Sequence, residues 1–314
     1  METDENRTQY RIIRAGVFSG ALAAAAAVGW MAFFSPSWAA QGERPLHVFV
    51  SVPPHAYLVE RIGGDEVKVE ELVPAGQDPH TFEPTPSQVV ALARARLFFQ
   101  VGMPFERRLV ARIAASHAGL EVVDTRAGIE LLEGVCTICA EGQPHGTPHH
   151  HHGEPDPHIW LSPPLLKAQA TTIADALCRV DPDRAASYRR NLAALIEELD
   201  DLDGRIGAEL EPYRGRAFYV FHPAFGYFAA AYGLRQEAVE VEGKNPTPRQ
   251  LRELIRRAQA DGVEVLFVQP QFDTSAAEVV AEAIGGRVEK LDDLAPDLTA
   301  NLERIAERIA SSMP

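Results

Sequence analysis

The chain has 314 residues, 46% of them hydrophobic, and a formal net charge of −14 at pH 7. Such an acidic surface argues against nucleic acid and anionic membrane surfaces as partners, because both are themselves negatively charged. The length exceeds what one compact hydrophobic core usually organises, so we expect two lobes.

The first 39 residues have the features of a secretory signal peptide. A polar, arginine-bearing stretch precedes an apolar run from Ala15 to Phe34, and Ser37 and Ala39 then occupy the −3 and −1 positions of a cleavage site. We expect cleavage after Ala39 and a soluble periplasmic protein with no direct membrane anchor. An uncleaved anchor is the alternative, because the apolar run is about long enough to span a bilayer.

Residues 45–181 are predicted to form an N-terminal α/β lobe. Short β-branched or aromatic runs alternate with helical stretches, a pattern that predicts a parallel sheet flanked by helices. Thr85 and Pro86 mark one helix start, as N-cap and first helical residue. The predicted strands are 46–52, 67–73, 97–101 and 120–124, and the predicted helices are 56–62, 86–95, 105–116 and 164–179.

Residues 128–157 interrupt this lobe with a segment rich in Gly, Pro, His and Cys, which is typical of a mobile surface loop. Such a segment is too flexible to preorganise one tight metal site. We therefore interpret its histidines as an auxiliary metal-collecting tract. The alternative is a solvated linker that has metal affinity but no role. The tract consists of His145, His149, His150, His151 and His152.

Cys136 and Cys139 lie beside this histidine tract. In an oxidising compartment the pair is a candidate disulfide. The alternative is that both thiolates join the loop histidines in a second zinc site.

A long linking helix is predicted within residues 182–212. Apolar residues recur at helical spacing from Tyr188 to Ile206, and about 27 helical residues would extend about 40 Å. Such a helix can join two lobes as a stiff spine. Residues 213–314 then repeat the alternation as a C-terminal α/β lobe. Its predicted strands are 217–221, 236–241, 263–268 and 287–291, and its predicted helices are 225–232, one starting at 247–248, 275–284 and 298–309.

Four candidate metal ligands follow predicted strands. They are His80, His158, His222 and Asp292. Ligands of open α/β sheets bind beyond the carboxyl ends of the strands, so two lobes that meet there can place all four residues on one ion. Three imidazoles and one carboxylate suit tetrahedral zinc. Taken one at a time, each histidine also has a purely structural explanation.

The motifs around these residues resemble one family. Asp-Pro-His occurs twice, at Asp78-Pro79-His80 and Asp156-Pro157-His158, and Phe221-His222-Pro223 and Leu291-Asp292 follow. Together they are similar to the periplasmic solute-binding proteins of zinc and manganese ABC transporters, the ZnuA and TroA type. The resemblance covers nearly all of the mature chain. It implies two α/β lobes joined by one long helix, with the metal held between them and delivered to a membrane permease.

The resemblance places the family's first three ligands on His80, His158 and His222. Its fourth position falls on Asp292, where Asp293 replaces the proline usual in relatives. Asp292, Asp293 and water remain alternatives for that place. Pro223 stands where many relatives carry aspartate, which removes one carboxylate that could orient an imidazole.

These features predict a monomeric zinc-binding protein whose Zn²⁺ is cargo and not a catalytic cofactor. Histidine at the third ligand position favours zinc, because nitrogen ligands suit zinc better than the oxygen-preferring manganese. Manganese or another divalent metal is the alternative within the family. A zinc hydrolase is a second alternative, although the chain has no His-Glu-x-x-His helix, and a metal-independent adhesin of the same fold is a third.

Overall fold

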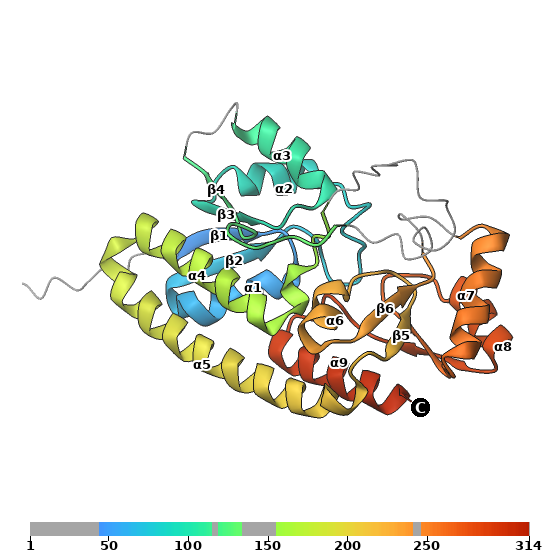
Figure 1. Cartoon of the computed structure of the whole chain (residues 1–314). Helices are drawn as coiled ribbons and strands as arrows, with labels where there is room; N and C mark the ends of the chain where they lie inside the picture. The colour runs from blue at the N-terminus through green and yellow to red at the C-terminus, as the bar shows by residue number, and fades with distance from the viewer. Residues whose placement is uncertain (1–43, 115–118, 134–154, 241–245, 314) are drawn as a thin grey trace, which may run out of the picture. The chain divides into compact units, whose positions relative to one another are not determined.

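The computed structural model describes residues 44–114, 119–133, 155–240 and 246–313 (Figure 1). The predicted signal peptide, the histidine tract from His145 to His152, and the Cys136–Cys139 pair lie outside these described residues.

The N-terminal sheet has the strand order β2-β1-β3-β4, and all its neighbouring strands are parallel. Its central strands β1 and β3 are the most apolar and the most deeply buried, as expected where helices cover both faces. The strands are β1 (Leu46–Val50), β2 (Val67–Glu71), β3 (Leu97–Gln100) and β4 (Glu121–Asp124). The helices of this part are α1 (Pro53–Gly63), α2 (Pro86–Leu92), α3 (Pro104–Ala114) and α4 (Pro163–Val180).

The C-terminal sheet has the equivalent order β6-β5-β7-β8 and is also parallel throughout. The likeness extends to one helix start, because Thr85 before α2 and Thr247 before α7 both form a capping box with a glutamine three residues later. The strands are β5 (Ala217–Val220), β6 (Arg235–Ala238), β7 (Val265–Val268) and β8 (Arg287–Lys290). The helices are α6 (Gly226–Tyr232), α7 (Pro248–Ala260), α8 (Ser275–Ile284) and α9 (Leu298–Ser312).

The long helix α5 (Ala185–Leu210) connects the two sheets and has 26 residues. It packs against α4 and α1 of the first lobe and against α9 of the second (Figure 1). The predicted fold class, two parallel sheets flanked by helices with one long helix between them, is therefore confirmed. Short 3-10 turns complete the described elements: η1 (Gly64–Glu66), η2 (Ile159–Leu161), η3 (Pro182–Arg184) and η4 (Glu211–Tyr213).

One hydrophobic core runs through both lobes. Phe49 of β1, Leu199 of α5 and Leu302 of α9 belong to the same buried cluster. Strand β5 divides its side chains between two clusters, because successive residues of a strand point to opposite faces. Phe218 joins the shared core, whereas Tyr219 joins a smaller core under α7 and α8. The apolar contacts between the lobes oppose wide hinge opening.

Several boundaries differ slightly from the predicted ones. Helix α1 begins at Pro53, although the sequence predicted a start at Ala56. Pro53 and Pro54 are tolerated there because the first turn of a helix needs no backbone N–H donors. Strand β6 ends at Ala238, earlier than the predicted end at 241, and this places Glu240 in a loop.

Candidate metal centre

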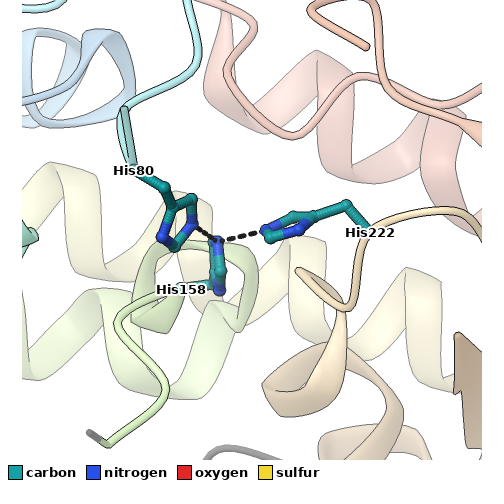
Figure 2. Close-up of side chains that lie close together, drawn as sticks. All are labelled: His80, His158 and His222. Carbon is teal, nitrogen blue, oxygen red and sulfur yellow. Dashed lines mark hydrogen bonds between the residues drawn. The ribbon is translucent and has the colours of Figure 1, made fainter. Parts of the chain in front are cut away.

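Three of the four predicted ligands converge. His80 comes from the loop between β2 and α2, His158 from the segment just before η2, and His222 from the loop that follows β5. The Nε2 atoms of His80 and His158 are 3.2 Å apart, and those of His222 and His158 are 3.4 Å apart (Figure 2). The ligand atoms of all three lie within 4.8 Å of one another. Two nitrogens bound to one tetrahedral zinc ion at about 2.0 to 2.1 Å would be about 3.3 to 3.4 Å apart, so the two separations measured from His158 fit a single ion.

Asp156 holds the most buried of these imidazoles. Its Oδ1 accepts from the backbone N–H of His158 at 2.9 Å and from the Nδ1–H of the same residue at 2.7 Å. Burial lowers the pKa of His158, but Asp156, with help from the charges of Asp293 and Asp78, outweighs burial and raises this pKa overall. Because Nδ1 carries the proton in the neutral ring, the lone pair lies on Nε2, the atom that faces the other two histidines.

His222 has an equivalent partner in Glu240, whose Oε2 lies 2.5 Å from His222 Nδ1. Gln269 fixes the backbone: its Oε1 accepts from the N–H of His222 at 3.3 Å, and its Nε2 donates to the carbonyl at 2.7 Å. Phe272 stacks on the imidazole at a centroid distance of 5.0 Å. In both His158 and His222, a carboxylate at Nδ1 therefore orients the ring so that Nε2 faces the other histidines.

His80 repeats the backbone turn of His158 without its carboxylate partner. The N–H of His80 donates to Asp78 Oδ1 at 2.9 Å, but Asp78 Oδ2 accepts from the Thr81 hydroxyl at 3.0 Å. Burial, followed by the nearby His158 and His222, lowers the pKa of His80 to about 2. Both Asp-Pro-His motifs thus form the same backbone turn, but only in the second does the aspartate, Asp156, also bond to the imidazole. His80 also lines a surface cavity of about 600 Å³, together with Phe82 and Phe105.

Neither the fourth predicted ligand, Asp292, nor its neighbour Asp293 joins this group of histidines. Asp292 Oδ1 accepts instead from the N–H of Leu294 at 2.8 Å. Asp293 is the buried carboxylate of this corner, with 2% of its surface exposed, and Gln271 Nε2 donates to its Oδ1 at 2.8 Å. Burial raises the pKa of Asp293, while Gln271 and the charges of His158 and His222 act in the opposite direction.

Glu240 is a neighbour of the candidate site that the sequence interpretation missed. Pro223 removes a carboxylate from the position next to His222 in the chain, as predicted. Glu240, from the loop after β6, places a carboxylate on His222 all the same. The predicted strand 236–241 had included it as a strand residue. The usable signal was its place at the carboxyl end of a strand that neighbours β5, where loop residues of both strands meet.

Comparison with known families gives a match over most of the chain. A family model described as "ZnuA: Zinc-uptake complex component A periplasmic" matches residues 48–311. Among the described residues, none of the helices combines the length and the apolar character needed to cross a membrane.

Two relatives illustrate the range of metals. The high-affinity zinc uptake system protein ZnuA of Bacillus subtilis (strain 168) is 30% identical over 254 residues, covering 79% of this chain and 78% of that protein. The manganese ABC transporter substrate-binding lipoprotein PsaA of Streptococcus pneumoniae is 29% identical over 272 residues, covering 80% of this chain and 85% of that protein. The two identities are nearly equal, so overall similarity does not distinguish zinc from manganese.

Solved structures share the fold. A crystal structure of ZnuA has 40% sequence identity and a TM-score of 0.77, and the match covers 86% of this chain and 100% of that one. A ZnuA deletion mutant with zinc bound has 41% identity and a TM-score of 0.76, with coverage of 85% and 98%.

Proposed function

We propose that this chain, which belongs to the ZnuA family of periplasmic components of metal uptake, binds one zinc ion through His80, His158 and His222 and delivers it to an ABC-transporter permease. Members of this family are the metal-binding, substrate-binding components of ABC transporters. Zinc is then cargo, and the proposal assigns no catalytic step to the protein.

The observation that carries this proposal is the convergence of three imidazole Nε2 atoms from two lobes. Two of these imidazoles, those of His158 and His222, carry a carboxylate on Nδ1. Such carboxylate–histidine pairs raise the basicity of the nitrogen that faces the metal. A nitrogen-rich ligand set favours zinc over manganese, and this supports zinc where sequence identity does not decide.

For the fourth coordination position we propose Asp293, in place of Asp292. Asp293 is buried, and the charges of His158 and His222 act to lower its pKa. Asp292 instead accepts a hydrogen bond from the backbone N–H of Leu294. A carboxylate there would complete a tetrahedral site with three nitrogens and one oxygen. Water bound in place of Asp293 is the competing arrangement.

The remaining parts of the proposal rest on sequence. The mature protein is expected to be periplasmic after cleavage of residues 1–39, and to be monomeric. The tract His145, His149, His150, His151 and His152 is proposed to collect zinc, and Cys136 and Cys139 to pair as a disulfide. Mass measurement with and without reductant tests the last point.

Isothermal titration of residues 40–314 with zinc and with manganese tests the proposed function. We expect zinc to bind more tightly than manganese, and His158→Ala to weaken zinc binding at the tight site at least 100-fold. His47→Ala is the matched control, because His47 is also bonded to a carboxylate but lies outside the site. His47 of β1 is 3.0 Å from Glu70 of the neighbouring strand β2. Tighter binding of manganese, or unchanged zinc binding in His158→Ala, would refute the proposal.

A further inference from the structure

Trp160 connects the two halves of the candidate site. Its indole Nε1 donates to the backbone carbonyl of Asp293 at 2.7 Å. Its ring meets the ring of His158 edge to face, with centroids 5.2 Å apart and an interplanar angle of 61°. Trp160 belongs to η2 in the first lobe, and Asp293 follows β8 in the second. One buried side chain therefore contacts a histidine of one lobe and the ligand-bearing loop of the other.

Trp160 is also surrounded by buried polar side chains of the first lobe. His55 of α1 meets the indole ring edge to face at a centroid distance of 6.3 Å. The Nε2–H of His55 donates to Oε1 of Gln169 in α4 at 2.9 Å, and Gln169 Nε2 donates to the carbonyl of Ile159 at 3.0 Å. All three side chains His55, Trp160 and Gln169 have no exposed surface. The indole therefore has little freedom to turn away from Asp293.

We infer that Trp160 is a positioning residue, which sets the loop of Asp293 against His158 and thereby the fit of the site to its metal. This inference rests on the proposed function. The indole N–H is the essential group, because it donates the hydrogen bond to the carbonyl of Asp293 and phenylalanine has no such donor. The rest of the ring supplies packing that phenylalanine can largely replace. Removing the N–H leaves the carbonyl of Asp293 buried without this partner and frees the loop to shift.

The experiment compares residues 40–314 with the same chain carrying Trp160→Phe. For Trp160→Phe we expect zinc affinity to fall about 5- to 10-fold, the order of one lost hydrogen bond. We also expect the visible absorption spectrum of bound cobalt to change, because it reports coordination geometry. Tyr232→Phe is the matched control: it removes another buried aromatic hydrogen bond, at 2.9 Å to Asp203, from an element that supplies no ligand. Its zinc affinity and cobalt spectrum should equal those of the wild type.

The wild type supplies an independent readout. Trp160 is the one tryptophan after the predicted cleavage site, since Trp30 and Trp38 precede it. Saturating zinc should therefore change the tryptophan emission of residues 40–314, and this test holds even when Trp160→Phe fails to fold. Emission that stays constant, or wild-type affinity together with a wild-type cobalt spectrum in Trp160→Phe, would overturn the inference alone. A wild-type chain that binds neither zinc nor cobalt would overturn the proposed function as well.

Discussion

Glu240 Oε2 lies 2.5 Å from His222 Nδ1, and Asp156 Oδ1 lies 2.7 Å from His158 Nδ1. Each lobe thus contributes one histidine that is oriented by a carboxylate of its own. The two carboxylates reach their histidines by different routes, since Asp156 is a near neighbour in sequence and Glu240 comes from the next strand's loop. The pairing fixes which nitrogen of each ring faces the interlobe site.

Replacing Glu240 by glutamine should weaken zinc binding about 10- to 100-fold, because the imidazole of His222 loses its charged partner. Competition titration against a chelator of known affinity measures this loss. Glu70→Gln is the control, since it removes the carboxylate of the His47 pair outside the site. Equal affinities for Glu240→Gln and Glu70→Gln would show that the Glu240 contact does not serve the metal.

Zinc affinity should fall as the pH drops. The pKa of His158 is raised in the metal-free protein, so protons compete with metal from a pH somewhat above the ordinary histidine value of 6.5 downward. Below that pKa the loss should approach about tenfold per pH unit for the one proton displaced. Asp156→Asn should move the onset to lower pH, because the charge that favours the imidazolium is gone. Titrations of both proteins from pH 5 to pH 8 check this, and an onset that does not move would contradict it.

His55 should make the metal-free protein less stable in acid. Burial lowers the pKa of His55 to about 4, from 6.5 in the unfolded chain. The unfolded state therefore binds a proton first, and stability is lost progressively as the pH falls from about 6.5 to about 4. The loss should be on the order of 3 kcal/mol. Urea unfolding of the wild type and of His55→Gln at pH 7 and pH 4.5 measures it. The variant should lose less stability between these pH values, and an equal loss would refute the assignment.

A polar contact between the lobes should stabilise the fold. The hydroxyl of Tyr57 in α1 donates to Glu198 Oε1 of α5 at 3.0 Å and lies 2.9 Å from Thr299 Oγ1 of α9. Tyr57→Phe should lower the free energy of unfolding by about 1 to 2 kcal/mol. Thr299→Val should cost less in the Tyr57→Phe background than in the wild type, because the two share one hydrogen bond. Additive losses in chemical unfolding would contradict this coupling.

The fold was largely predictable because the spacing of hydrophobic residues distinguishes helices from strands. Strands such as Leu97–Gln100 and helices such as Ala185–Leu210 lie where the pattern predicts them. The convergence of His80, His158 and His222 was also predictable, since all three follow strands of parallel sheets, whose carboxyl ends share one edge.

The carboxylates were less predictable for a physical reason. Side chains of successive residues point in opposite directions only while the backbone is a strand. Strand β8 ends at Lys290, one residue before the predicted Leu291. The alternation therefore does not determine which of Asp292 and Asp293 faces inward. Glu240 depends on the contact between two loops that are distant in sequence. Local patterns carry no information on such a contact.

Anomalous diffraction at the zinc edge from crystals of residues 40–314 grown with zinc tests the central claim most directly. The account predicts one strong peak between the lobes, about 2.0 to 2.1 Å from the Nε2 atoms of His80, His158 and His222. A protein that holds zinc only at other positions, with no peak among these three nitrogens, would contradict it.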